Sequence, residues 1–177
     1  LSLSPPLGRR SLFRRAFHKD QDMNIIGTNN NDYLYGSNLA DRLDGGAGND
    51  YLAGQFGIDT YVFGRGYGLD MVSDSFDGNI IEILAGVAPA DLMVAADANA
   101  GYGWVLGIQG TTDRLSVYSD ILEVRFADGT VWNRTTLVTR SRIGNDLDQS
   151  ITGTEGDNTL NGRGGNDRLF GGGGNDT

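Results

Sequence analysis

The chain has 177 residues with a formal net charge of −9, and 38% of them are hydrophobic, which allows a modest core and excludes a disordered protein. Five basic and two acidic residues lie in positions 1–22, which leaves 9 basic against 21 acidic residues in positions 23–177. This acidity excludes nucleic acid as a partner, because phosphate binding requires clustered Lys and Arg, and it favours cations. The absence of cysteine excludes disulfides and thiolate metal sites.

Residues 1–22 are expected to form a separate tail. Four of its apolar side chains share the spacing of one helical face, namely Leu12, Phe13, Ala16 and Phe17. A membrane-surface helix is therefore one interpretation, and we favour the other, a disordered tail or sequence upstream of a true start at Met23. No apolar run reaches the roughly 18 residues of a membrane span, and no apolar segment follows the arginines as in a signal peptide, so membrane contact is not indicated. The start at Leu1 and the end inside a repeat indicate a fragment.

Residues 23–74 repeat every nine residues, most clearly in Gly45-Gly46-Ala47-Gly48-Asn49-Asp50-Tyr51-Leu52-Ala53. Each repeat opens on glycine and has aspartate at its sixth position, which gives the turns 27–32, 36–41, 45–50 and 54–59. A short fixed period predicts a solenoid, in which two repeats, about 18 residues, make one coil with a strand on each face. The apolar eighth residues are predicted to stack inside it, namely Ile25, Leu34, Leu43, Leu52 and Tyr61. A degenerate repeat over residues 65–73 is shifted by two residues and predicts the end of regular stacking.

Residues 75–143 lose the period and are predicted to form a small antiparallel β unit that caps the first array. The expected strands are Ile80–Leu84, Leu92–Ala95, Trp104–Ile108, Leu115–Tyr118, Val124–Phe126 and Thr130–Trp132. Asp128-Gly129 between the last two is a hairpin signal. The period returns in residues 144–177, a second array that the chain cuts short, with Ile151, Leu160 and Leu169 expected to point inward.

The turns combine glycine, which allows backbone carbonyls to converge, with carboxylates. Calcium accepts six to eight such oxygens in irregular geometry, whereas magnesium demands a tighter octahedron and transition metals favour His or Cys, of which the chain has only His18. Because turns on one edge belong to alternate repeats, an ion is expected between Asp32 and Asp50, between Asp41 and Asp59, and between Asn158 and Asp176. Asp70 is a candidate for one further ion beyond Asp50, which gives two to four sites.

The alternative is a metal-free solenoid, because Asn and Asp are common in turns without any metal. Turn preference alone does not explain aspartate at the sixth position of seven of eight turns, counting the degenerate one. Carboxylates stacked about 5 Å apart would also repel one another without a cation. We therefore favour calcium.

Gly45 to Ala53 matches the pattern Gly-Gly-x-Gly-x-Asp-x-apolar-x throughout, and Gly171 to Asp176 matches as far as it extends. The chain thus resembles the RTX, or haemolysin-type calcium-binding repeat, family. Residues 80–132 resemble a domain that often follows such repeats in large bacterial exoproteins. The resemblance implies a right-handed parallel β-roll, calcium binding by the turns and export from Gram-negative bacteria by a type I secretion machinery.

By this resemblance, carboxylate ligands come from Asp32, Asp41, Asp50, Asp59, Asp167 and Asp176. Carbonyl ligands come from the turns, at Gly27, Asn29, Gly36, Asn38, Gly45 and Ala47. The sequence departs from the pattern at Thr28, Ser37, Gln55 and Asn158, which puts the first coil and the Asn158 site most in doubt.

The sequence therefore predicts an all-β protein, a parallel β-roll plus a small antiparallel unit, that binds calcium in a secreted, extracellular exoprotein. It predicts no enzyme, because one histidine excludes a His-Glu-x-x-His site and no Gly-x-Ser-x-Gly motif occurs. One alternative is a segment of a secreted protease or lipase whose catalytic domain lies outside this chain. Another is an adhesin module that binds sugar through Tyr102, Trp104 and Trp132, although aromatic residues in strands are more often core.

Overall fold

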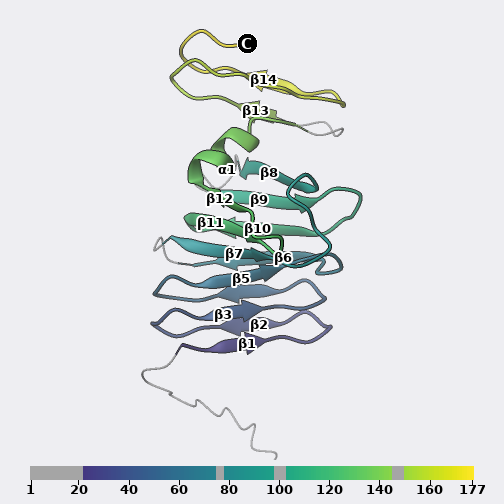
Figure 1. Cartoon of the computed structure of the whole chain (residues 1–177), viewed down its shortest axis with the longest axis vertical. Coiled ribbons are helices and arrows are strands. Elements are labelled where there is room, and N and C mark those ends of the chain that lie inside the picture. Colours follow the sequence, from purple (N-terminus) through teal and green to yellow (C-terminus); the bar gives the residue numbers. More distant parts are fainter. Residues whose placement is uncertain (1–21, 75–77, 98–102, 145–149) are drawn as a thin grey trace, which may run out of the picture.

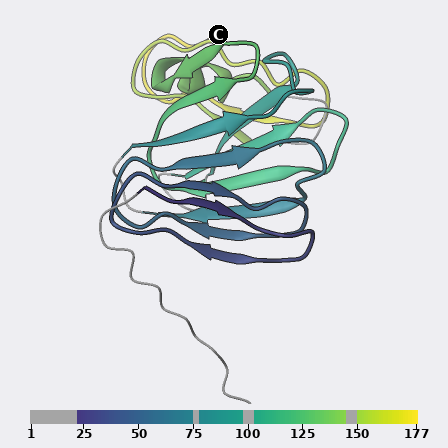
Figure 2. The same ribbon diagram turned by 60° about the horizontal axis from the view of Figure 1, so that its bottom comes forward.

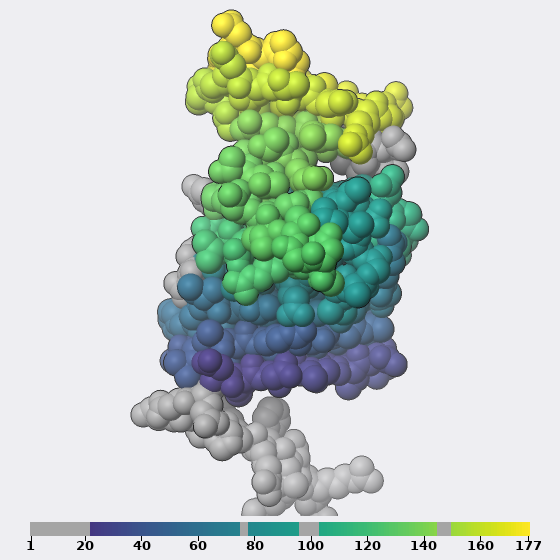
Figure 3. Space-filling model, in the orientation of Figure 1, coloured from purple at the N-terminus to yellow at the C-terminus, as the bar shows by residue number. Residues whose placement is uncertain are grey.

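Short strands stack in layers along the long axis of the molecule, as the computed structural model shows for residues 22–74, 78–97, 103–144 and 150–177 (Figure 1). Two six-stranded sheets face each other along most of this stack (Figure 2). A third sheet of two strands lies at the C-terminal end, in the region that Figure 3 draws in yellow-green to yellow. The parallel strands of the stack confirm the prediction of a β-roll.

The first sheet has the order β1-β3-β5-β7-β11-β12 and the second the order β2-β4-β6-β10-β9-β8. The strands of the first sheet are β1 (Asn24–Ile26), β3 (Arg42–Asp44), β5 (Thr60–Phe63), β7 (Asn79–Ile83), β11 (Ile121–Phe126) and β12 (Val131–Asn133). Those of the second are β2 (Tyr33–Tyr35), β4 (Tyr51–Ala53), β6 (Leu69–Ser73), β10 (Arg114–Tyr118), β9 (Gly103–Ile108) and β8 (Leu92–Asp97).

The nine-residue repeat produces this alternation between sheets. Leu43 pairs with Ile25 in the first sheet, and Leu52 pairs with Leu34 in the second. In each pair the two residues are 18 positions apart in the sequence. The middle residue of each strand points inward, and Leu43, Leu52 and Tyr61 are 0% exposed. The predicted coil of two repeats and the predicted interior stack are therefore confirmed.

The predicted end of stacking at the degenerate repeat is wrong. β6 and β7 continue the two sheets with partners 20 residues apart, since Val72 pairs with Leu52 and Ile81 with Tyr61. The two extra residues lie in the connection between β5 and β6, because Tyr61 and Val72 are 11 residues apart whereas Val72 and Ile81 are 9 apart, so the strands keep their alignment. Regular layers therefore extend beyond the nonapeptide repeats.

The middle block forms the six predicted strands, and it joins the roll directly. β10 pairs parallel to β6 and β11 pairs parallel to β7, so both sheets pass from the repeats into the block. Antiparallel pairing begins only after that, between β10, β9 and β8 and between β11 and β12. One hydrophobic core runs from Leu43 in the roll to Leu137 in the block.

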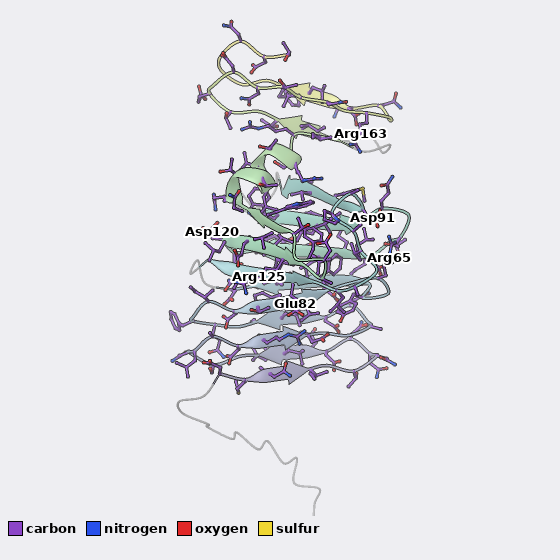
Figure 4. The ribbon with its side chains drawn as sticks, in the orientation of Figure 1. Arg65, Glu82, Asp91, Asp120, Arg125 and Arg163 are labelled. Carbon is purple, nitrogen blue, oxygen red and sulfur yellow. The ribbon has the colours of Figure 1, made fainter. Side chains whose placement is uncertain are left out.

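Two surface ion pairs connect residues of different layers. Arg42 on β3 donates both Nε and Nη2 to Glu82 on β7, at 2.9 and 3.0 Å. Arg65, before β6, pairs with Asp91, before β8, at 3.1 Å (Figure 4). The second pair ties the last turn of the roll to the middle block.

A short helix, α1 (Arg134–Arg140), follows β12, and the sequence prediction missed it. Asn133 caps its first turn by accepting the Thr136 N–H, and Leu137 is buried beneath it. The guanidinium of Arg140 lies 3.9 Å from the centre of the Trp132 ring. Among the described residues no helix has the length and apolarity that crossing a bilayer requires.

The second array forms β13 (Ser150–Thr152) and β14 (Arg168–Phe170), which pair in parallel 18 residues apart. Ile151 is buried as predicted, whereas Leu169 is 46% exposed because no further layer covers it in the structure. Leu160 is half-buried and lies in no strand. The helix considered for Leu12 to Phe17 lies outside the described residues.

Candidate metal centre

The turns between strands stack on two edges of the roll. The first edge holds the turns 27–32, 45–50 and 65–70, and the second holds the turns 36–41 and 54–59, with Asp74 and Asn79 in the next layer. Strand pairing sets the height of each turn, so equivalent residues of successive coils lie directly above one another. The sixth-position carboxylates therefore form a column on each edge.

Each column is joined by hydrogen bonds from backbone to carboxylate. On the first edge, Asp32 N donates to Asp50 Oδ1 at 2.8 Å, and Asp50 N donates to Asp70 Oδ1 at 2.9 Å. The structure thus brings Asp32 to Asp50 and places Asp70 in the same column. On the second edge, Asp41 N donates to Asp59 Oδ1 at 2.7 Å.

The second-edge column continues past the repeats, because Asp59 N donates to Asn79 Oδ1 at 2.9 Å. Sequence reasoning missed Asn79, since it follows Asp59 by 20 residues instead of 18. In the second array, Asn158 N donates to Asp176 Oδ1 at 3.0 Å, so that pair is also together.

The other carboxylate oxygen of three column residues has no hydrogen-bond partner among the described residues. These atoms are the Oδ2 of Asp50, Asp59 and Asp70, and the three side chains are at most 3% exposed. A buried charged oxygen without a donor is costly, and a bound cation would remove that cost. Burial, followed by the charge of neighbouring Asp50, raises the pKa of Asp70 to about 7. Burial likewise raises the pKa of Asp50.

Glycine at the first position of a turn leaves space where oxygens from two layers converge. A Cβ atom added to Gly36 would lie 2.5 Å from Gly54 O in the next layer and 2.6 Å from Asp41 Oδ2 in its own turn. One added to Gly153 would lie 2.1 Å from Gly171 O and 2.3 Å from Asn158 Oδ1. A carbonyl and a side-chain oxygen therefore face the same point in both arrays.

The first edge has the same arrangement at Gly27, where an added Cβ would lie 2.2 Å from Gly45 O and 3.0 Å from Asp32 Oδ2. Thr28 O and Asn30 O also face the next layer, because they lie 2.5 and 2.8 Å from the Cβ positions of Gly46 and Gly48. Sequence reasoning placed Gly45 O at the site and missed these two carbonyls. For the carbonyls of Asn29, Asn38 and Ala47 the sequence prediction stays a prediction.

The departures at the second position have visible consequences. Thr28 donates its N–H at 2.6 Å and its hydroxyl at 2.8 Å to Asp32 Oδ2, so this oxygen is satisfied within its own turn. Ser37 N donates to Asp41 Oδ2 in the same way at 2.5 Å. Gln55 adopts a φ of 82°, a conformation that favours glycine, and its Nε2 donates to Gly36 O at 2.5 Å. The Gly36 carbonyl is thus already engaged in this structure.

The remaining predicted ligands lie in the second array. Asp167 Oδ2 and Asp176 Oδ2 lie 2.3 and 2.1 Å from the Cβ positions of Gly162 and Gly171, in the arrangement of the first array. Asp176 is exposed and Asp167 half-buried, whereas Asn158 is 6% exposed. No group of three or more His, Asp or Glu side chains converges in the part of the chain that the structure describes. The oxygens available at each turn are therefore one or two carboxylates together with backbone carbonyls.

This donor set fits calcium. It consists of oxygen atoms alone, from carboxylates and carbonyls in irregular loops, and includes buried carboxylate oxygens that lack a donor. An RTX calcium-binding nonapeptide repeat model matches residues 26–61 and 143–177, in four copies. No curated protein gives a match to the chain. Repeats of this kind fold as a β-roll and bind Ca²⁺, and the two arrays of this chain carry RTX calcium-binding nonapeptide repeats.

Proposed function

We propose that the chain is the calcium-binding β-roll segment of a secreted bacterial exoprotein, and that it folds when it meets calcium outside the cell. The observation that carries this proposal is the set of three buried carboxylate oxygens without a hydrogen-bond donor, on Asp50, Asp59 and Asp70. They lie in columns where neighbouring carboxylates are one strand spacing apart, about 4.8 Å. Such columns oppose folding until their charge is balanced.

At low calcium concentration the carboxylates repel, and the short strands bury too little apolar surface to offset the entropy of the chain. A bound calcium ion would supply positive charge at these turns. Asp32 Oδ2 and Gly45 O face one point between two layers, and Asp41 Oδ2 and Gly54 O face another, so these oxygens would hold it. Binding only to the folded chain stabilises it by about 2.7 kcal/mol per site at a hundredfold excess over Kd.

A calcium titration followed by far-UV circular dichroism tests the proposal. We expect little β structure in excess chelator and a cooperative rise of the β signal as calcium is added. Asp50→Asn should shift the midpoint to higher calcium, whereas Asp128→Asn, in the exposed β11–β12 turn, should leave it unchanged. A β-rich spectrum in chelator that calcium does not alter would contradict the proposal.

Export by a type I secretion machinery of a Gram-negative bacterium is part of the same proposal, and the RTX repeats in the two arrays support it. A chain that stays loose at low cytosolic calcium can pass a narrow exporter, and it folds only after release. The alternative of a sugar-binding module loses its basis, because Trp104 and Trp132 are 7% and 4% exposed. Tyr102 lies outside the described residues.

A further inference from the structure

The second edge carries a further carboxylate, Asp74, in the layer that follows the last nonapeptide turn. Val72 pairs with Leu52 before this turn, and Ile80 pairs with Thr60 after it, both at a spacing of 20 residues. The same spacing places Asp74 above Gly54 and Asn79 above Asp59. Where the repeats have a glycine at the first position of the turn, this layer therefore has an aspartate.

Asp59 lies below this layer and has an oxygen without a partner. Its side chain is 0% exposed, and its Oδ1 accepts the Asp41 N–H at 2.7 Å. Its Oδ2 has no hydrogen-bond partner and lies 2.1 Å from the Cβ position of Gly54, the residue that Asp74 overlies. The unpaired oxygen thus faces the first residue of its own turn, the position that Asp74 occupies in the next layer.

Asp74 is held in place from two sides. Its Oδ2 accepts the hydroxyl of Tyr61, which is 0% exposed and itself accepts the Gly54 N–H at 2.7 Å. The same oxygen accepts Asn79 Nδ2 at 3.1 Å, and this amide also donates to Ser119 Oγ at 3.3 Å. These bonds fix the Asp74 carboxylate at the boundary between the roll and the middle block.

The side chain of Asn79 links Asp59 to Asp74. Its Oδ1 accepts the Asp59 N–H at 2.9 Å, and its Nδ2 donates to Asp74 Oδ2 at 3.1 Å. A fully buried carboxylate with an unsatisfied oxygen, Asp59, and a half-buried carboxylate, Asp74, in the next layer favour a cation between them or the loss of one charge.

We propose that Asp59 and Asp74 bind a calcium ion one layer beyond the last nonapeptide turn, at the junction of the roll and the middle block. The donors are two carboxylates, with the Tyr61 hydroxyl beside them, and this all-oxygen set suits calcium. The inference rests on the proposed function that the chain binds calcium. Asp74 lies outside residues 26–61, where the repeat pattern is matched, so the pattern alone does not assign it.

Calcium stoichiometry, measured by equilibrium dialysis of the full chain, tests this site. Asp74→Asn keeps the shape and the oxygen that accepts the Tyr61 hydroxyl, and it removes the charge. We expect it to bind one calcium ion fewer per chain than the unchanged protein. The control is Asp128→Asn, the same substitution in an exposed turn, and it should retain the full number.

The outcomes separate this site from the proposed function. If the unchanged chain binds no calcium, both ideas are wrong; if Asp74→Asn binds as many ions as the unchanged chain, only this site is wrong. If Asp74→Asn does not fold in calcium, Asn79→Asp decides, because it adds a third carboxylate to the cluster. If the proposed site binds calcium, Asn79→Asp should fold in saturating calcium. It should also require a lower calcium concentration for half-maximal folding than the unchanged protein. A variant that stays unfolded at every calcium concentration would overturn the proposal.

Discussion

At the scale of single residues, glycine and aspartate of one turn share the same small volume. The Cβ position of Gly36 coincides with the point that Gly54 O and Asp41 Oδ2 face, so a side chain there would occupy the place of a ligand. The φ of Gly36 lies outside the left-handed region, so its backbone conformation does not require glycine. Glycine is required there because a side chain would fill the space between the two oxygens. The second position differs between turns. Gly46, Gln55 and Arg163 adopt there a positive φ that favours glycine, whereas Thr28 and Ser37 do not.

Replacing Gly36 by alanine should therefore remove binding at the Asp41 and Asp59 pair. We expect one calcium ion fewer per chain by equilibrium dialysis, because the methyl group would lie within about 2.6 Å of both oxygens. Gly156→Ala is the matched control, since nothing lies within 4 Å of its Cβ position and its φ is not positive. Equal stoichiometry in both variants would show that the space at Gly36 is not a ligand position.

Sequence spacing predicted which carboxylates meet in the repeats, and it failed where the spacing changes. Asp32 and Asp50 lie 18 residues apart, and the structure joins them as expected. Asp74 and Asn79 belong to no nonapeptide repeat, so the repeat pattern did not identify them. The signal that could have found them is the spacing of 20 between Asp50 and Asp70, which also separates Asp59 from Asn79.

At the scale of strands, burial depends on how many layers cover each strand. Leu52 on β4 and Leu169 on β14 occupy the same repeat position, yet the first is 0% and the second 46% exposed. The nine-residue period predicts both to point inward. Only the number of neighbouring layers decides how much apolar surface each removes from water.

This difference predicts unequal losses for the same truncation. Leu52→Ala should lower the free energy of unfolding in saturating calcium by about 2–5 kcal/mol, because it leaves a cavity in the continuous core. Leu169→Ala should cost less than about 1 kcal/mol. Urea denaturation of both variants measures this, and losses of equal size would contradict the described packing.

Element prediction succeeded for the strands and failed for the helix. Alternating apolar residues located all six strands of the middle block, and Asp128-Gly129 located the turn between β11 and β12. Residues 134–140 contain Thr135, Thr136, Val138 and Thr139, whose β-branched side chains have low helix propensity. Burial of Leu137 and the Asn133 cap outweigh that propensity, and both depend on tertiary structure.

At the scale of the whole molecule, acidity links folding to protons as well as to calcium. Burial holds the pKa of Asp70 at about 7 in the folded chain, well above the value near 3.9 of an unfolded aspartate. A raised folded-state pKa means that the folded chain binds protons more tightly. Its relative stability therefore rises as pH falls from about 7 toward 4, and it is lost again as pH rises through 7.

We accordingly expect protons to replace calcium in part. In calcium-free buffer, far-UV circular dichroism should show more β structure at pH 5 than at pH 7.5. Asp70→Asn should weaken this response, because its amide keeps an oxygen for the Asp50 N–H and does not titrate. Loss of β structure on acidification over this range would show that these carboxylates do not limit folding of the metal-free chain.

The stacking direction also determines how the molecule would respond to force. Strand β1 and the C-terminus lie at opposite ends of the stack, and the hydrogen bonds between successive layers run along the line that joins them (Figure 1). Tension between the two ends would act parallel to these bonds, so the bonds of one layer would break before those of the next. The roll would therefore lengthen in small steps at low force, each releasing one coil, and layers joined by a calcium ion, as we propose, would be the last to separate.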